Sequence, residues 1–414
     1  MELKKYRLGD IVDFNKETIS KQDNYLEIKY LDTSSVLDNV ISKTPSMKLA
    51  DAPSRAQRKV GHLTIIYSTV RPRLKHHGIL HMPPENLIVS TGFATLDIKD
   101  CYENMIDATY LYLLLTQSTV TEYLGNIADT AVSAYPSINP SDISALSFIF
   151  PDITIQRKIA SIWTSYDQKI HLNSAINDNL EAMARQLYDY WFVQFDFPNE
   201  KGKPYKSSGG DMVWNEKLKR EIPEGWNVAN VFDELSVQYG FPFSTELFTE
   251  EPTSIPVVRI RDILENSVSA YSEEEVDEKY KLQKQDLLVG MDGNFHMNYW
   301  NDNVSYLNQR SVRLRAKSKS TVSIMQAKYD IAPYIKAKEL RAKGSTVGHL
   351  SDKDLKELFV LVCPNIDFRN KFDSILAEII ENRCEMIELT KQRDELLPLL
   401  MNGQATVNYH LSAY

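Results

Sequence analysis

The chain of 414 residues repeats itself, and this repeat restricts its possible folds more than any other feature. Five short patterns recur in the same order in the two halves, with partners 212 to 229 residues apart. The pairs are Tyr6–Asp13 with Trp226–Asp233, Ile28–Asp32 with Val257–Arg261, Thr64–Ser68 with Asp286–Gly290, Ala94–Leu96 with Val312–Leu314, and Ile143–Pro151 with Leu355–Pro364. Such an ordered repeat indicates two domains of similar fold.

Each repeat is followed by a heptad pattern. After Pro151 and after Pro364, apolar residues alternate at spacings of four and three for about five heptads, which is typical of a coiled coil. The predicted seam contains Ile159, Ile162, Tyr166, Leu180, Met183, Leu187 and Tyr190 in the first helix, and Phe372, Ile375, Ile379, Met386 and Leu389 in the second. Polar Lys169 and Asn382 lie near the middle of the seams, where such residues fix the register.

The predicted fold class is therefore α+β. We expect two similar α/β domains separated by two long helices, which pair as an antiparallel coiled coil in a pseudo-two-fold cyclic arrangement. The predicted parts are domain 1 (1–150), a spacer helix (151–197), a return loop (198–225), domain 2 (226–363), and a second spacer helix with a tail (364–414). Pro, Gly and Ser are frequent in 198–210, which predicts a flexible connection.

The charge of the chain is unevenly distributed. The net charge of −9 argues against a protein that coats nucleic acid. However, Lys43–His77 contains eight Lys or Arg residues and one acidic residue. Asn303–Leu350 contains ten Lys or Arg residues and two acidic residues. Three widely separated cysteines argue against a disulfide framework and favour a reducing compartment. Without an apolar run of about 18 residues, we expect a cytoplasmic protein with no membrane contact.

Motifs for catalysis are missing from the sequence. It contains no GxxxxGK[ST] phosphate loop, no GxSxG elbow, no HExxH and no glycine-rich dinucleotide fingerprint. The acidic run Glu273–Glu278 could be interpreted as the metal cluster of a nuclease, but it is more simply a solvated face. We therefore predict no catalytic residue, no metal site and no bound cofactor.

A basic loop follows the predicted strand Thr64–Ser68 in the first half. The candidate DNA-binding residues of this half are Arg55, Arg71, Arg73, Lys75, His76 and His77. Loops on a rigid sheet commonly carry recognition residues. Arginine can pair with guanine edges, and Lys or Arg can bind phosphates, so this loop is sufficient for DNA recognition. The alternative is an ordinary solvated surface.

The corresponding loop of the second half is nearly uncharged and rich in Asn, His and aromatic residues. Its candidate DNA-binding residues are Asn294, Phe295, His296, Asn308, Gln309, Arg310 and Arg313. Asn can pair with adenine and aromatic rings can stack on bases, so we expect this loop to read bases. Phosphate contacts would come from Arg310, Arg313, Arg315, Lys317, Lys336, Lys338, Arg341 and Lys343. The two domains would then read different half-sites of a bipartite target.

These patterns resemble the specificity (S) subunit of type I restriction-modification systems over nearly the whole chain. The strings that carry the resemblance are Tyr6–Ile11, Ser68–Pro72, Ser90–Ala94, Gln156–Ala160, Gln186–Phe192, Leu287–Gly293, Leu307–Arg310 and Leu399–Gln404. The resemblance implies two target recognition domains, each reading one half of an asymmetric bipartite site in double-stranded DNA. It also implies helices whose length sets the gap between the halves.

The resemblance further implies partners. Such subunits dock two S-adenosylmethionine-dependent adenine methyltransferase (M) subunits, and the larger assembly adds ATP-driven restriction and translocation (R) subunits. S-adenosylmethionine, ATP and Mg²⁺ would be bound by those partners, so this chain would be no enzyme itself. The alternatives are a coiled-coil scaffold whose basic loops bind an acidic protein, a degenerate specificity subunit, and a metal-dependent nuclease that uses Glu273–Glu278.

Overall fold

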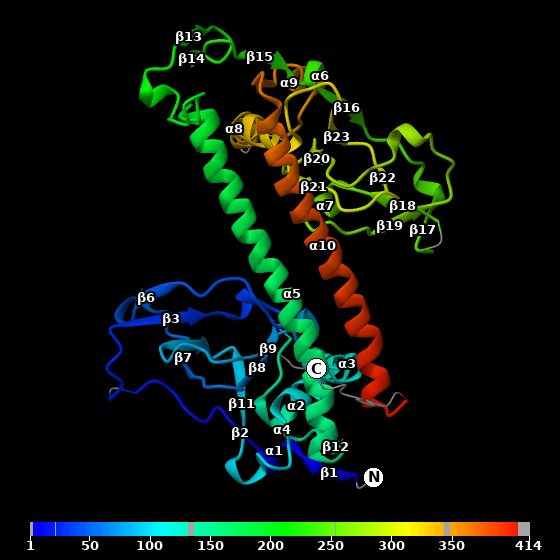
Figure 1. Cartoon of the computed structure of the whole chain (residues 1–414). Coiled ribbons are helices and arrows are strands. Elements are labelled where there is room, and N and C mark those ends of the chain that lie inside the picture. Colours follow the sequence, from blue (N-terminus) through cyan, green and yellow to red (C-terminus); the bar gives the residue numbers. More distant parts are fainter. Residues whose placement is uncertain (1–2, 21, 131–135, 253, 343–347, 405–414) are drawn as a thin grey trace, which may run out of the picture. The chain divides into compact units, whose positions relative to one another are not determined.

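The computed structural model describes residues 3–20, 22–130, 136–252, 254–342 and 348–404 (Figure 1). The chain forms two compact units, one of residues 1–167 and 393–414, the other of residues 168–392. The two long helices, α5 (Ile153–Tyr188) and α10 (Ile366–Met401), each contribute to both units. Within the described residues, no helix is both long and apolar enough to cross a membrane.

The first unit contains two four-stranded sheets, with strand orders β6-β3-β10-β7 and β2-β11-β8-β9. Their strands are β2 (Val12–Phe14), β3 (Glu27–Leu31), β6 (Ser46–Lys48), β7 (Ala56–Lys59), β8 (Ile65–Ser68), β9 (His77–Ile79), β10 (Leu87–Ser90) and β11 (Phe93–Ile98). The other elements are β1 (Lys4–Arg7), α1 (Leu8–Ile11), the hairpin β4 (Val36–Leu37) and β5 (Val40–Ile41), α2 (Ala108–Leu115), α3 (Ser118–Asp129), α4 (Pro140–Ser144) and β12 (Ser147–Phe150). Strand β1 pairs with β12.

Strand β8 lies at the centre of this unit because its side chains are apolar on both faces. Successive side chains of a strand point to opposite faces of the sheet. Ile66 packs in the cluster that joins the two sheets, whereas Ile65 and Tyr67 pack in the cluster under the helices. Both neighbours of β8, β11 and β9, run antiparallel to it. The loop that leaves β8 after Ser68 is therefore held by a rigid sheet.

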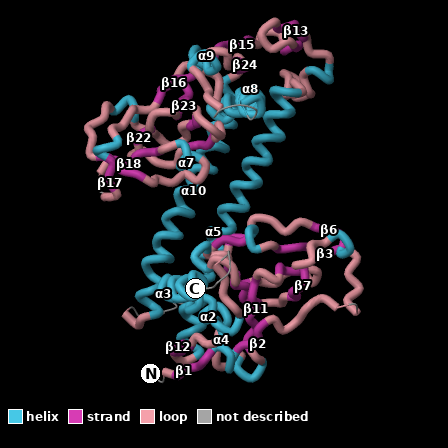
Figure 2. Tube along the Cα trace, turned by 180° about the vertical axis from the view of Figure 1, so that it is seen from behind, coloured by secondary structure: helices cyan, strands magenta, loops and turns pink. Residues whose placement is uncertain are grey.

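The second unit repeats this arrangement, with sheets β16-β23-β20-β21 and β17-β19-β18-β22 and the pair β15-β24 (Figure 2). The strands are β15 (Asn227–Asn230), β16 (Leu235–Tyr239), β17 (Phe248–Thr249), β18 (Ile255–Val258), β19 (Ala270–Ser272), β20 (Leu287–Gly290), β21 (Met297–Tyr299), β22 (Tyr306–Leu307), β23 (Ser311–Ala316) and β24 (Phe359–Val362). The helices are α6 (Val231–Glu234), α7 (Ile260–Ile263), α8 (Ile324–Ala342) and α9 (Asp352–Leu355).

The predicted duplication is confirmed, but two predicted alignments are shifted. Val89 pairs with Leu31 and the equivalent Leu307 pairs with Val258, so the pairing of Ile28 with Val257 is wrong by two residues. The pairing of Tyr6 with Trp226 is wrong by three. Leu8 donates its backbone N–H to the carbonyl of Leu146 at 2.9 Å, and Val231 donates to Leu358 at 3.0 Å in the same place of the second unit. Leu8 therefore corresponds to Val231, and not to Val228 as the pairing of Tyr6 with Trp226 required. The sequence misled because Trp226 is an aromatic residue at a strand entrance, yet it packs in the aromatic cluster with Phe197.

The two long helices contact each other in antiparallel order. In the second unit, Lys169 pairs with Glu385 at 3.1 Å, and Trp191, further along α5, stacks on Phe368, near the start of α10, with ring centroids 4.3 Å apart. In the first unit, Ile159 and Leu400 lie in the same apolar cluster. A π-helical turn (Asp189–Val193) extends α5, and Pro398 lies inside the last turn of α10.

The contact face of these helices differs from the predicted seam. Ile159, Phe372 and Ile379 are buried as expected. Ile162, Tyr166, Leu180, Leu187, Ile375, Met386 and Leu389 are only partly buried, and Met183 and Tyr190 are exposed. The buried positions of α5 include Trp163, Asp167, Asn173, Asn177, Ala184 and Tyr188, and Trp191 is buried in the turn that follows. The helix α5 carries two rows of apolar residues that are offset by about one position. Heptad spacing alone therefore did not show which of the two rows is buried.

The connector after α5 contains secondary structure where the composition predicted a flexible loop. Tyr205 stacks on Phe197 with ring centroids 4.7 Å apart, and Ser207 bonds to Asp196 through both its N–H and its hydroxyl. The hairpin β13 (Met212–Asn215) and β14 (Arg220–Pro223) follows. Aromatic stacking thus offsets the flexibility of the Pro, Gly and Ser residues in this segment.

Candidate nucleic-acid interface

In the first unit, main-chain hydrogen bonds hold the loop that leaves β8. Thr69 donates its N–H to the carbonyl of Gly92 at 2.9 Å, and its own carbonyl accepts the N–H of Ile138 at 2.8 Å. Arg71 donates its N–H to the carbonyl of Pro136 at 2.9 Å. A short antiparallel bridge joins Val70 to Ser137. The loop after β8, the β10–β11 turn and the segment 136–138 therefore meet along one edge, which we call the recognition edge of the first unit.

The second unit builds the same edge with the same bonds. Met291 donates to Arg310 at 2.8 Å and accepts from Leu350 at 2.7 Å, and Gly293 donates to Gly348 at 2.9 Å. An antiparallel bridge joins Asp292 to His349. The recognition edge of the second unit thus consists of the loop after β20, the β22–β23 turn and the segment 348–350. Because every bond is between main-chain atoms, the two edges keep one geometry with different side chains.

Some of the predicted residues lie exposed at the first recognition edge. Arg55 and Arg71 are exposed, and the carbonyl of Arg55 accepts the N–H of Thr91, next to Gly92. Lys75 is exposed too, at the far end of the same loop. His76 is partly buried, and its Nδ1 lies 2.5 Å from the carbonyl of Val36. The structure thus brings Arg55 and Arg71 to one edge, where a polyanion can reach them.

The predicted role of Arg73 in binding DNA is not supported by its contacts. Its guanidinium group bonds to Glu122 at 2.9 Å, Asp129 at 2.6 Å and Asn126 at 2.6 Å, all on α3. These partners raise the pKa of Arg73 further above its usual range. A Cβ added to Gly125 would meet the Arg73 side chain at 2.6 Å, so the arginine lies flat on this helix. Arg73 docks the loop onto α3.

His77 is a second correction in the first unit. It is 2% exposed, stacks on Tyr67 with ring centroids 5.6 Å apart, and its Nδ1 lies 3.0 Å from the hydroxyl of Tyr112. Burial lowers the pKa of His77 to about 4, so the imidazole is neutral at pH 7. The residue stabilises the core and cannot contact phosphate from this position.

In the second unit, Asn294, Gln309 and Arg310 are exposed at the recognition edge, and His296 and Asn308 are partly exposed. Arg310 Nη1 lies 3.5 Å from Asp292, whose other oxygen lies 2.5 Å from His349 Nδ1. This is a small charged cluster on otherwise uncharged loops. Asn, Gln and Arg are the side chains that recognise adenine and guanine in the major groove.

Phe295 and Arg313 do not lie where the sequence predicted them. Phe295 is 6% exposed and belongs to the core of the second unit, so it cannot stack on a base. Arg313 is also 6% exposed; it lies on β23, bonds to Ser236, and burial lowers its pKa. Successive side chains of a strand point to opposite faces of the sheet, and Arg313 is buried because both faces of β23 are covered at this position.

Most of the expected phosphate-binding residues of the second half also have partners within the protein. Arg315 forms a bidentate pair with buried Asp286 at 2.6 and 2.7 Å. Lys317 bonds to two carbonyls of α6, and Lys338 pairs with Asp354. Lys336 pairs with Glu339 at 3.4 Å, Arg341 is exposed, and Lys343 lies outside the described residues. Basic charge in this stretch therefore stabilises the fold more than it forms a binding surface.

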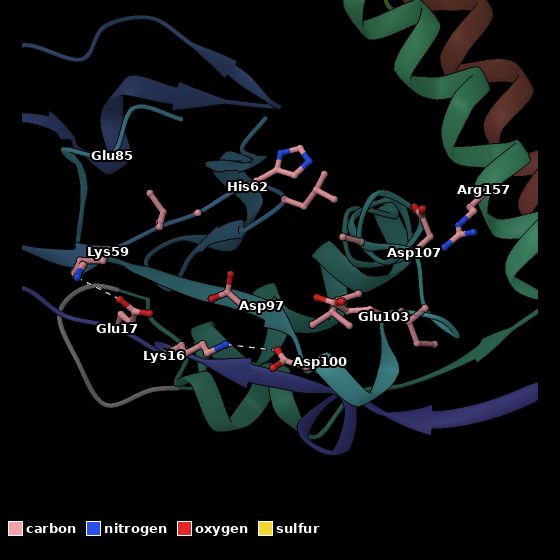
Figure 3. A pocket seen from close by; sticks show the side chains of 16 residues that line it. Lys16, Glu17, Lys59, His62, Glu85, Asp97, Asp100, Glu103, Asp107 and Arg157 are labelled. Carbon is pink, nitrogen blue, oxygen red and sulfur yellow. Dashed lines mark ion pairs between the residues drawn. The ribbon is translucent and has the colours of Figure 1, made fainter. Parts of the chain in front are cut away.

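A polar cleft of about 580 Å³ opens in the first unit (Figure 3). Its charges pair with one another: Lys59 with Glu17 at 3.3 Å, and Lys16 with Asp100 at 3.9 Å. Asp97 accepts a 2.5 Å hydrogen bond from Thr64. Across the described ranges, no three His, Cys, Asp or Glu side chains are grouped to hold a metal ion.

The acidic run Glu273–Glu278 makes contacts that maintain the loop. Glu274 accepts the N–H of Ser244 at 2.9 Å, and Glu278 accepts the hydroxyl of Tyr306 at 2.9 Å. Hydrogen bonds from Tyr306 and Lys281 lower the pKa of Glu278. These carboxylates are occupied with loop and strand contacts, which does not favour the nuclease interpretation.

Two residues that hold the starts of the long helices, one in each unit, were not among the predicted site residues. Gln156 is fully buried and bonds to the backbone of Asp107, Met105 and Pro151. In the second unit, Arg369 occupies the matching place after β24 and bonds to the carbonyls of Lys317 and Ser320. The duplication could have pointed to them, because Arg369 lies within one residue of the position that the 212-residue offset of this segment gives for Gln156.

Fold and site together define a class of protein: two domains built on one scaffold, each with a clamped polar edge and each followed by a long helix. Comparisons with known proteins specify the family. The model of the type I restriction modification DNA specificity domain matches residues 1–182 and again residues 223–398. The chain belongs to this family and carries the domain twice.

Individual relatives agree with this family. The chain is similar to the HindI specificity subunit of Haemophilus influenzae (33% identity over 47% of this chain) and the MjaIX specificity subunit of Methanocaldococcus jannaschii (26% over 80%). The matches span 41% of the HindI subunit and 76% of the MjaIX subunit. The S subunit structure from M. genitalium has the same fold, with a TM-score of 0.54, 17% identity and coverage of 96% of each chain.

Proposed function

We propose that this chain is the DNA-specificity subunit of a type I restriction-modification complex and reads an asymmetric bipartite site. The observation that carries the proposal is the pair of recognition edges, which share one main-chain geometry but differ in side chains. Arg55 and Arg71 dominate the first edge, whereas Asn294, Gln309 and Arg310 dominate the second. Two different readers on one duplicated frame suit two different half-sites.

The chain would contribute recognition and no chemistry. Two adenine methyltransferase subunits would dock to it and bind S-adenosylmethionine, and restriction subunits would supply ATP and Mg²⁺ chemistry. In this assignment the helices α5 and α10 set the distance between the half-sites. The cytoplasm, where the chromosome of a prokaryotic cell lies, would be its place of action.

The test is methylome sequencing of DNA from cells that produce this chain together with its methyltransferase partner. The expected result is one bipartite motif with methylated adenine that disappears when this chain is omitted. If the complex assembles but no motif is methylated, the chain is a degenerate subunit. If no complex assembles, the scaffold alternative gains support and the proposed function fails.

A further inference from the structure

Two backbone positions of the recognition edges are equivalent in the two units but hold exchanged residue types. The shared hydrogen bonds place Arg71 opposite Gly293, because each donates its N–H to the clamping segment, at 2.9 Å in both units. They also place Gly92 opposite Arg310, because each carbonyl accepts the N–H at the start of the loop. Each edge thus has one arginine and one glycine, on opposite loops.

Both arginines have a left-handed backbone. The φ angle is 48° at Arg71 and 70° at Arg310, and Gly293 has a φ of 70° at the position equivalent to Arg71. This region is unfavourable for residues with a Cβ atom and natural for glycine. A long charged residue in a place that suits glycine indicates that its side chain is used.

Two other arginines of the same segments form ion pairs with acidic side chains. Arg73 is held by three side chains of α3, and Arg315 is paired with buried Asp286. Arg71 and Arg310 are exposed at the recognition edges. The contact of Arg310 with Asp292 is 3.5 Å long, and the Arg310 side chain is 61% exposed.

We propose that each unit reads its half-site through one left-handed arginine, Arg71 in the first and Arg310 in the second, presented from opposite loops of the common frame. This inference rests on the proposed function and names the specificity-determining residue of each half. The chemical target is the guanine edge in the major groove, which accepts two parallel hydrogen bonds from a guanidinium group. Lysine, a point charge, does not reproduce this fork.

The experiment compares methylomes of cells that produce the methyltransferase complex with wild-type chain or with Arg71→Gly, Arg71→Lys, Arg310→Gly or Arg310→Lys. Glycine preserves the left-handed backbone, so the variants should fold and assemble with an unchanged or raised thermal midpoint. We expect each Arg71 variant to relax one base position of one half-site at least tenfold, and each Arg310 variant to do so in the other half.

Lys219→Gly is the matched control. Lys219 is exposed, has a φ of 52°, and lies between β13 and β14, where it pairs with Glu216 at 2.8 Å. This variant makes the same change of charge and backbone away from the recognition edges, and it should leave the motif unchanged. Arg71→Lys distinguishes base reading from a phosphate contact, because lysine would preserve the motif only in the second case.

A variant that should gain a base preference provides an independent test. A Cβ added to Gly293 meets no atom within 4 Å, and Arg71 already adopts the left-handed backbone at the equivalent position. Gly293→Arg should therefore be accommodated with some loss of thermal stability and add a base preference to the second half-site. At Gly92, an added Cβ would meet Thr33 at 2.9 Å, so that position is not used. Unchanged motifs in the Arg71 and Arg310 variants, motifs preserved by lysine, or loss of both halves together would overturn the inference. Absence of a motif with the wild-type chain would instead refute the proposed function.

Discussion

Arg71 and Arg73 are two residues apart on one loop, yet their surroundings differ completely. Arg73 pairs with Glu122 and Asp129 on α3, and Arg71 lies at the recognition edge, where its N–H bonds to the carbonyl of Pro136. The count of basic residues in Lys43–His77 could predict that this stretch contacts a polyanion. It could not predict which cations have acidic partners within the fold, because those partners lie about fifty residues further along the chain.

His77 gives the first unit a dependence on acid. The unfolded chain takes up a proton on this residue near pH 6.5, but the folded protein does so only near pH 4. Stability is therefore present above pH 6.5 and is lost as the pH falls from 6.5 to 4, by about 3 kcal/mol. Thermal unfolding of His77→Gln, followed over this range, should lose this part of the pH slope. An unchanged pH slope in His77→Gln would contradict this assignment.

Asp330 gives the second unit the opposite dependence. It accepts bonds from Tyr188 at 2.7 Å and from Leu361 and Gln326 at 3.1 Å, yet burial raises its pKa to about 6. The unfolded value is 3.8, so its contribution is complete below pH 3.8 and is lost as the pH rises to 6, by about 3 kcal/mol. Asp330→Asn should flatten this part of the slope in thermal unfolding. A slope that survives the substitution would assign it to another group.

Among the elements, the long helices show what heptad spacing can and cannot predict. Spacing predicted both helices, because few other structures keep apolar residues at alternating intervals of four and three. It did not predict the face, because Met183 and Tyr190 fit the pattern but are exposed, whereas Asn173 and Asn177 are buried. Burial of asparagine depends on a partner from the other helix, which no local pattern reveals.

Asn177 should contribute measurably to helix pairing. Its amide donates to the carbonyl of Ile379 at 3.3 Å and accepts from Asn382 at 3.0 Å. Asn177→Ala leaves Asn382 without this acceptor, so we expect chemical denaturation to show a loss of about 1 to 2 kcal/mol. Asn179→Ala, on the exposed face of the same helix, should change stability by less than about 0.5 kcal/mol. Equal effects of the two variants would contradict this assignment.

For the whole molecule, the repeat determined how much could be predicted. Five matched patterns were enough for the duplicated fold, because a repeat requires only that equivalent strands occur in the same order. The candidate site was predicted to the level of its loops. The exchange of Arg and Gly between the two edges was not predictable. Which positions are equivalent becomes clear only from the main-chain hydrogen bonds made by segments 136–138 and 348–350, which precede α4 and α9.

Shortening both helices by one heptad tests their proposed role as spacers. Removal of residues 170–176 and 382–388 preserves the heptad phase and shortens the helices by about 10 Å. If helix length sets the gap, the methylated motif should keep both half-sites and lose about 3 base pairs of spacing. Methylome sequencing of cells with the shortened chain measures this directly. An unchanged gap would show that the helices do not act as a ruler.

The hydrogen bonds that the two recognition edges share join main-chain atoms. Such bonds are indifferent to which side chains the loop bears, so mutations there leave the underlying scaffold undisturbed. If the chain reads DNA as proposed, its target can change through substitutions at a few loop positions, without any compensating change in the core. Target choice and fold would then evolve independently of each other.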